Sequence, residues 1–216
     1  MVKVKVCGIT NLEDALLAAE AGADALGFNF YLRSPRYIAP EEARRIIKVL
    51  PQAIFCVGVF VNEERPETVA RMAAVSGVGA VQLHGDESPE YCAALVERRV
   101  IKALRVGKDF VPEGAAQYRV ESVLLDAFSA SARGGTGETF DWTLARKTRE
   151  VVAQLYLAGG LTPENVAGAI AAVAPYAVDV CSGVEFAPGR KDMSRVRAFI
   201  SAVRACEKNL DAQTAT

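Results

Sequence analysis

The order of secondary-structure signals along the chain predicts an α/β fold, a single (β/α)8 TIM barrel with eight parallel strands. Short apolar segments alternate with helical segments from end to end, and each strand–helix unit occupies about 25 to 30 residues, a length that suits such a barrel. An open doubly wound sheet is the alternative. No GxGxxG string follows the first strand, so the barrel is favoured over a dinucleotide-binding fold.

The strands are marked by short runs rich in Val, Ile and Leu, of which the first alternates apolar and polar residues. They are expected at Val2–Cys7, Ala25–Phe28, Ile54–Phe60, Ala80–Leu83, Val100–Leu104, Ser122–Asp126, Leu155–Ala158 and Ala177–Cys181.

Helices are expected after nearly all of these strands, several with apolar residues at three- and four-residue spacing. They lie at Asn11–Ala21, Pro40–Leu50, Pro66–Val75, Ser88–Arg98, Trp142–Val152, Pro163–Val173 and Asp192–Cys206. The expected start signals are the N-caps Asn11, Ser88 and Thr162 and the first-turn prolines Pro40, Pro89 and Pro163.

The fifth unit is the weakest, because Lys108–Tyr118 contains a proline and a glycine, so its helix is expected to be short or irregular. No low-complexity linker divides the chain. One catalytic domain is therefore predicted over residues 1–207, and the polar residues 208–216 are expected to form a frayed tail.

The composition excludes several classes of protein. The 216 residues carry 25 Lys and Arg against 26 Asp and Glu, a net charge of −1, which gives no reason to expect nucleic acid as a partner. The longest apolar run, Ala53–Val61, is too short to span a bilayer, and no export signal is expected before the first strand. Five scattered cysteines without a CxxC pair argue against disulfides and a zinc site, and favour the reducing cytoplasm.

Two strand ends carry residues suited to acid–base chemistry. Cys7 closes the first strand and Asp126 closes the sixth. A buried cysteine is often only a small hydrophobe, whereas a carboxylate at the end of an apolar strand is poor core material. At the carboxyl ends of barrel strands, where active sites lie, the two offer a base and an acid at the same rim, as a proton-transferring isomerase requires.

Lys5 shares the inward face of the first strand with Cys7, because side chains alternate along a strand. Asp179, on the last strand, is its obvious partner, since a lone buried ammonium is costly and the last strand adjoins the first in a closed barrel. Two interpretations stay open: a structural ion pair low in the barrel, or an electrostatic contribution to the site that favours the Cys7 thiolate.

Other residues at the same rim could contact a small substrate. His84, the single histidine, follows the fourth strand and either lines the site or is a polar loop residue. Arg36 could clamp a carboxylate through its guanidinium, and the alternative is a solvated loop charge. Candidate anion-binding positions are the glycine-rich turns after the later strands, Gly135, Thr136, Gly159, Gly160, Ser182 and Gly183. A serine triad or a histidine metal site is not expected, because both would depend on His84.

The strings at seven of the eight strand ends resemble the phosphoribosylanthranilate isomerase family of tryptophan biosynthesis, in order over nearly the whole chain. These strings are Lys5-Val6-Cys7-Gly8-Ile9-Thr10, Gly27-Phe28-Asn29-Phe30, Arg33-Ser34-Pro35-Arg36-Tyr37, Val57-Gly58-Val59-Phe60-Val61-Asn62, Gln82-Leu83-His84-Gly85-Asp86-Glu87, Gly134-Gly135-Thr136-Gly137, Ala158-Gly159-Gly160-Leu161, Asp179-Val180-Cys181-Ser182-Gly183-Val184-Glu185 and Pro188-Gly189-Arg190-Lys191-Asp192.

The resemblance implies an Amadori rearrangement of N-(5′-phosphoribosyl)anthranilate with no metal and no cofactor. It implies that Asp126 is the general acid that protonates the furanose ring oxygen, and Cys7 the general base that takes the C2′ proton. It further implies that Arg36 meets the anthranilate carboxylate and that the glycine-rich turns bind the phosphate. His84 and Asp179 complete the candidate substrate-binding set. Members resembling this chain occur as monomers and as homodimers.

Two rival functions are weighed. The related barrel isomerase of histidine biosynthesis resembles a duplicated half-barrel with an aspartate at the end of the first strand and a second phosphate site in the N-terminal half. Here Cys7 closes the first strand and no second glycine pair is found there, so this rival is disfavoured. A non-catalytic phosphate-binding barrel would be expected to lose Cys7 or Asp126, and both are present.

Overall fold

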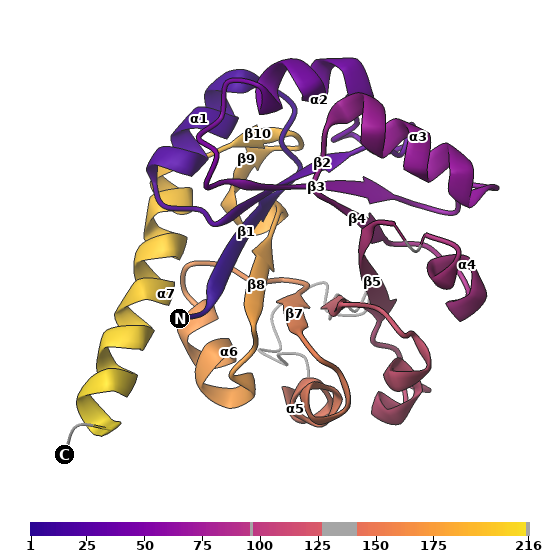
Figure 1. Ribbon diagram of the computed structural model, residues 1–216. Coiled ribbons are helices and arrows are strands. Elements are labelled where there is room, and N and C mark those ends of the chain that lie inside the picture. The colour runs from indigo at the N-terminus through magenta and orange to yellow at the C-terminus, as the bar shows by residue number, and fades with distance from the viewer. Residues whose placement is uncertain (96, 127–141, 215–216) are drawn as a thin grey trace.

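The computed structural model describes residues 1–95, 97–126 and 142–214, with side chains described as far as Cys206. Eight parallel strands form a closed barrel in sequence order, surrounded by helices, which confirms the predicted fold (Figure 1). The strands are β1 (Lys3–Cys7), β2 (Ala25–Asn29), β3 (Phe55–Phe60), β4 (Ala80–Leu83), β5 (Arg99–Arg105), β6 (Ser122–Asp126), β7 (Leu155–Ala158) and β8 (Ala177–Val180).

The helices pack outside this barrel because each strand presents alternate apolar side chains to them. They are α1 (Leu12–Glu20), α2 (Pro40–Ile47), α3 (Pro66–Ser76), α4 (Pro89–Ala93), α5 (Trp142–Val151), α6 (Val166–Val173) and α7 (Met193–Thr214). Two predicted caps form as expected: the Asn11 side chain accepts a hydrogen bond from Asp14 N, and the Ser88 side chain accepts one from Tyr91 N.

The fifth unit has no α-helix, and a 3-10 helix, η1 (Pro112–Gln117), takes its place, which confirms the short, irregular element expected there. Three helices are shorter than predicted by three or more residues. Helix α2 ends at Ile47 rather than Leu50. Helix α4 ends at Ala93 rather than Arg98, since β5 begins at Arg99 and the chain must turn before it. Helix α6 begins at Val166 rather than Pro163, because Asn165 Oδ1 accepts a hydrogen bond from Thr162 N and holds a turn before the helix.

The C-terminal helix is longer than predicted. Helix α7 continues to Thr214, beyond the predicted end at Cys206. The added residues contain no Pro or Gly, so no helix-breaking residue ends the helix earlier. A short antiparallel hairpin was also not predicted: β9 (Glu185–Ala187) pairs with β10 (Arg190–Lys191) after β8, and Gly189 turns it with a φ of 75°.

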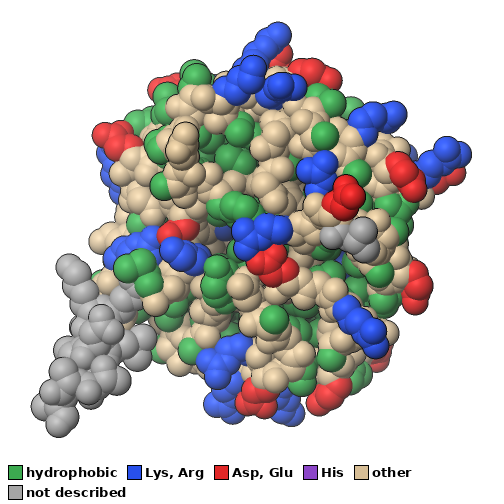
Figure 2. All heavy atoms as spheres, viewed as in Figure 1, with side chains coloured by type: hydrophobic (Ala, Val, Ile, Leu, Met, Phe, Trp, Pro, Cys, Tyr) green, Lys and Arg blue, Asp and Glu red, His purple; other side chains and the backbone are tan. Residues whose placement is uncertain are grey.

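Charged side chains of both signs are interspersed over the face shown in Figure 2, without a broad patch of one sign. Among the described residues, no helix is long and apolar enough to cross a membrane.

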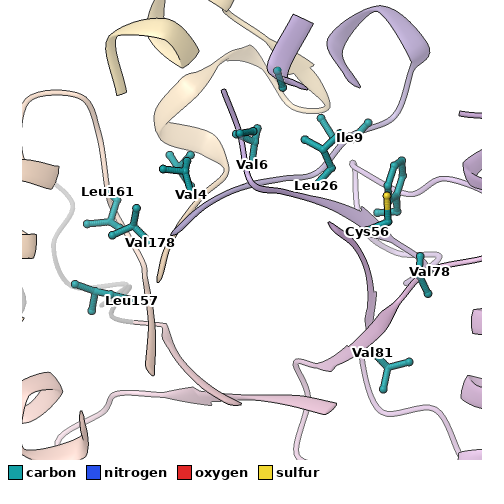
Figure 3. Close-up of a cluster of buried hydrophobic side chains, with 14 of the residues drawn as sticks. Val4, Val6, Ile9, Leu26, Cys56, Val78, Val81, Leu157, Leu161 and Val178 are labelled. Atoms are coloured by element: carbon teal, nitrogen blue, oxygen red, sulfur yellow. The ribbon is translucent and has the colours of Figure 1, made fainter. Parts of the chain in front are cut away.

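The hydrophobic core has two parts, one between strands and helices and one inside the barrel. The valine side chains of Val4 and Val6 lie outside the ring of strands, with Leu26, Val81 and Val178 (Figure 3). Lys5 therefore points into the barrel, as the alternation predicts. The inner part of the core is filled by Val57, Ala80, Ile101, Ala103, Leu124, Tyr156, Ala158 and Ala177.

Candidate active site

The carboxyl ends of the strands surround one cavity of about 260 Å³. It is lined by Cys7, Asn29, Arg36, Val59, Gln82, His84, Asp126, Ala158, Gly159, Gly160, Leu161, Asp179, Cys181, Ser182 and Gly183. Every predicted site residue that the structure describes is in this set. Gly135 and Thr136 lie outside the described residues. The predicted site residues that the structure describes therefore lie together around this one cavity.

A second cavity of similar volume opens at the other end of the barrel. The four charged residues that line it form two ion pairs, Lys3 with Asp24 at 3.0 Å and Arg99 with Glu121. Because these charges neutralise one another, this end offers an ionic ligand little attraction. The first cavity is the better candidate site.

The buried ion pair of Lys5 and Asp179 forms the floor of the site. Lys5 Nζ lies 3.0 and 2.9 Å from the two carboxylate oxygens, and the strand register places the two residues opposite each other on β1 and β8. Burial opposes the Lys5 charge, but Asp179 and Cys7 more than offset it, so the pKa of Lys5 is raised. The predicted ion pair is thus confirmed, and Lys5 also interacts with the Cys7 side chain.

Lys5 and Cys7 meet over the bare backbone of Gly27. A Cβ at Gly27 would lie 2.6 Å from Cys7 Sγ and 3.1 Å from Lys5 Nζ, so only glycine leaves room for both groups. The ammonium of Lys5 therefore lies beside the thiol. Of the two interpretations left open for Lys5, the structure supports both a buried ion pair and an electrostatic contribution to the site.

The Cys7 thiol lies beside a second thiol, that of Cys181. The pKa of Cys7 lies well below its ordinary value, first because of a hydrogen bond from Cys181, and then because Lys5 favours the thiolate against the effect of burial. The same hydrogen bond, together with burial, raises the pKa of Cys181. Cys7 therefore ionises while Cys181 keeps its proton. All five cysteines are free thiols.

Asp126, across the cavity, contacts the single histidine. His84 Nε2 lies 3.1 Å from Asp126 Oδ2, and Gln82 Nε2 lies 2.9 Å from His84 Nδ1. With the Gln82 amide in this orientation its nitrogen donates to Nδ1, which places the ring hydrogen on Nε2, facing Asp126; the opposite tautomer goes with a turned amide. The Asp126 side chain is 27% exposed, so a group in the cavity can reach it. His84 lines the site, which decides between the two alternatives for this residue.

A buried ion pair between Lys102 and Glu87 stabilises the turn that follows His84. Lys102 Nζ lies 2.6 Å from Glu87 Oε2 and donates to the carbonyl oxygen of Gly85 at 2.8 Å. Glu87 in turn accepts hydrogen bonds from the backbone N–H groups of Asn62 and Gly85. Lys102 is not among the residues that line the cavity, and its contacts hold this turn in place.

Arg36 reaches the cavity from the loop after β2 and pairs with Glu185 of β9. Three contacts of 2.6 to 3.0 Å join the guanidinium to the carboxylate. Lys191 of β10 binds the same carboxylate at 2.9 Å and donates to the carbonyl oxygen of Cys7 at 2.5 Å. The guanidinium is thus anchored rather than free in solvent.

The glycine turns after β7 and β8 come together on one side of the cavity. Gly159 and Gly160 have φ values of 85° and 66°, which glycine adopts without strain. A Cβ at Gly183 would overlap the carbonyl oxygen of Leu161, so a side chain there would displace the turn. Close backbone approach of this kind presents N–H groups to an anion without interference from side chains.

Several residues that line or support this site were not predicted, among them Cys181, Gln82 and Glu185. Cys181 and Gln82 follow the inward alternation from Asp179 and His84, a signal that could have found them. The pairing of Glu185 with Arg36 spans 149 positions in the chain, and no local pattern indicates it. Among the described residues, no cluster of three or more His, Cys, Asp or Glu side chains could hold a metal ion.

Fold and site together define a barrel enzyme that can transfer protons on a small anionic substrate. The family model for N-(5′-phosphoribosyl)anthranilate (PRA) isomerase matches residues 4–202. The chain belongs to this family.

Curated relatives support this assignment. The N-(5′-phosphoribosyl)anthranilate isomerase of Trichlorobacter lovleyi is 57% identical over 200 residues, which is 93% of this chain and 97% of that protein. A crystal structure of the enzyme from Thermotoga maritima matches with a TM-score of 0.88 and 51% identity, covering 95% of this chain and all of that chain. Another family structure, in complex with reduced 1-(o-carboxyphenylamino)-1-deoxyribulose 5-phosphate, has a TM-score of 0.85, 50% identity and the same coverage.

Proposed function

We propose that this chain converts N-(5′-phosphoribosyl)anthranilate into 1-(2-carboxyphenylamino)-1-deoxyribulose 5-phosphate, the Amadori rearrangement of tryptophan biosynthesis. The observation that carries the proposal is the convergence of Cys7, Asp126 and Arg36 with the glycine turns on one cavity. The family assignment supports the same reaction. Substrate and product are isomers, so the chemistry requires only opening of the furanose ring and proton transfers, with no group lost or gained.

Asp126 is the general acid of this proposal. Its carboxyl proton passes to the furanose ring oxygen, the bond from that oxygen to C1′ breaks, and the nitrogen lone pair forms a protonated Schiff base. The contact with His84 Nε2 holds the carboxyl at the cavity wall. Gln82 Oε1 is buried and has no hydrogen-bond partner among the described residues. If the amide turned over, this oxygen would accept from Nδ1, and Nε2 could then accept a hydrogen bond from protonated Asp126.

Cys7 is the general base. Its thiolate takes the proton from C2′, the electrons of that C–H bond form the C1′–C2′ double bond, and the iminium nitrogen becomes neutral. The resulting enolamine tautomerises to the ketone as the C2′ hydroxyl loses its proton and C1′ gains one. The lowered pKa of Cys7 supports this role, because the thiolate is then present near neutral pH.

Arg36 and the glycine turns hold the two ends of the substrate. Arg36 binds the anthranilate carboxylate, and the backbone N–H groups around Gly159, Gly160, Ser182 and Gly183 bind the phosphate. Asp179 lines the cavity while paired to Lys5 and completes the substrate-binding set. Gly135 and Thr136 stay in this proposal as predicted phosphate-binding residues. We also propose a cytoplasmic location, a monomer or homodimer, and no cofactor.

The proposal is tested by turnover. Phosphoribosylanthranilate would be generated in place from anthranilate and phosphoribosyl pyrophosphate, and the decay of its fluorescence followed after adding the enzyme. We expect fast decay. A folded protein that gives no decay with this substrate, but turns over the aminoimidazole nucleotide of histidine biosynthesis, would establish the rival isomerase instead. No turnover of either substrate would favour a barrel that only binds.

Replacing Gly183 by alanine is expected to raise the KM for this substrate by about tenfold or more, with a smaller change in kcat. The added Cβ would overlap Leu161 O and move the turn that binds the phosphate. Gly107→Ala is the matched control, because a Cβ there meets nothing within 4 Å. Steady-state kinetics and inhibition by inorganic phosphate would be measured for both variants. Equal KM values for both variants and wild type would remove Gly183 from the phosphate site.

A further inference from the structure

The carboxylate of Glu185 binds two cations, Arg36 of the loop after β2 and Lys191 of β10. Lys191 also contacts the backbone of Cys7 at the end of β1. Arg36 Nε lies 2.9 and 3.0 Å from the two carboxylate oxygens, and Arg36 Nη2 lies 2.6 Å from Oε2. Lys191 Nζ lies 2.9 Å from Oε1, to which Gly189 N also donates at 3.3 Å. The side chains of Glu185 and Lys191 are only 4% and 0% exposed. The carboxylate is therefore fully engaged in the interior.

These contacts use one particular edge of the guanidinium. Arginine offers two forks of parallel N–H groups, one from Nε and Nη2 and the other from Nη1 and Nη2. Glu185 takes the first fork. Within residues 1–95, 97–126 and 142–214, no group accepts a hydrogen bond from Nη1, and Arg36 lines the cavity. The second fork is left for a ligand.

We propose that Glu185 is a positioning residue that fixes the Arg36 guanidinium so that its Nη1–Nη2 edge receives the ring carboxylate of the substrate. This inference rests on the proposed function, because it assigns the edge of Arg36 that the anthranilate group meets. An unanchored arginine would have to lose rotamer freedom when the ligand binds, and Glu185 removes that cost before binding.

Lys191 makes the cluster of Arg36, Glu185 and Lys191 positively charged and connects it to β1. Two cations and one carboxylate leave a net charge of +1 beside the cavity, which favours an anionic ligand. Despite burial, the hydrogen bonds from Arg36 and Lys191 hold the pKa of Glu185 below its ordinary value, so Glu185 stays ionised. Lys191 Nζ also donates to Cys7 O at 2.5 Å. The anchor of Arg36 is thereby tied to the end of β1.

The test separates orientation from charge. Dissociation constants would be measured by calorimetry for reduced 1-(2-carboxyphenylamino)-1-deoxyribulose 5-phosphate and for the same molecule without its ring carboxylate. The proteins are wild type, Glu185→Gln, and the double variant Glu185→Gln with Lys191→Met. The double variant keeps the cluster at +1, since Arg36 alone remains charged. Turnover by wild type and thermal melting of each protein would be recorded in parallel.

We expect wild type to bind the carboxylated ligand about 10- to 100-fold more tightly than the ligand without the carboxylate. This is the range expected for one charge-assisted hydrogen-bonded contact. In both variants this ratio should fall to about threefold or less, while the affinity for the ligand without the carboxylate changes little. A variant that keeps the wild-type ratio would overturn the inference. An equal loss of affinity for both ligands would also overturn it, because Glu185 would then only support the loop.

A third variant and the wild-type result keep the test decisive if the glutamine variants do not fold. If neither glutamine variant folds, Glu185→Asp is measured in the same way. Its carboxylate is one methylene shorter and cannot keep all the contacts to Arg36 and Lys191, so the ratio should again fall. A wild-type protein that neither turns over the substrate nor binds either ligand would overturn the proposed function itself. Turnover by wild type with an unchanged ratio in the variants would overturn only the role of Glu185.

Discussion

Replacing Asp126 by asparagine is expected to lower kcat by roughly 10²- to 10⁴-fold, the range contributed by one general acid. Asparagine has nearly the same shape but cannot give up a proton to the ring oxygen, so ring opening loses its acid. The affinity for the reduced product analogue should change much less, because Arg36 and the glycine turns are untouched. Fluorescence decay measures the rate, and calorimetry measures the affinity.

His84→Asn is the informative companion to this variant. It removes the contact at 3.1 Å to Asp126 Oδ2 but leaves the carboxyl itself in place. We expect a loss of about tenfold in kcat, clearly smaller than that of Asp126→Asn, since His84 holds the acid and does not replace it. Both variants should melt near the wild-type temperature. A folded Asp126→Asn protein that keeps more than a tenth of wild-type kcat would show that another group is the acid.

Strand alternation explains why so much of the site could be predicted. The pattern around Lys5 fixes which side chains enter the barrel, and barrel closure places Asp179 beside Lys5. A residue at the carboxyl end of any strand then belongs to one rim. That is why Cys7, Asp126 and the turns at Gly159 and Gly183 all line one cavity, although they are far apart in the chain.

What the sequence did not show depends on contacts between loops. The sequence indicated that Arg36 could clamp a carboxylate, but not that Glu185 occupies one edge of its guanidinium. That contact requires the hairpin after β8, whose two strands, of three and two residues, are too short for a periodic pattern. The end of α7 was also missed: the helix was predicted to end at Cys206, although no Pro or Gly follows before Thr214.

Replacing Cys7 by serine is the second large effect expected. Serine fits the space over Gly27, but its hydroxyl ionises far less readily than a thiol, so little base is present near neutral pH. We expect kcat to fall by roughly 10²- to 10⁴-fold. The pH profile of kcat/KM should also lose its acidic limb, which the proposal assigns to Cys7. A Cys7→Ser protein with a wild-type profile would place the base elsewhere.

Cys181→Ala is the control that tests how the thiolate is made. The hydrogen bond from Cys181 is the largest effect that lowers the pKa of Cys7, and Lys5 acts in the same direction. Removing the Cys181 thiol should therefore raise the pKa of Cys7 and leave Lys5 as its main support. Because the base is active when deprotonated, kcat/KM rises as pH passes upward through this pKa. The acidic limb should move to higher pH in Cys181→Ala, with a loss at neutral pH that recovers in alkaline solution. An unmoved limb would mean that Lys5 alone sustains the thiolate.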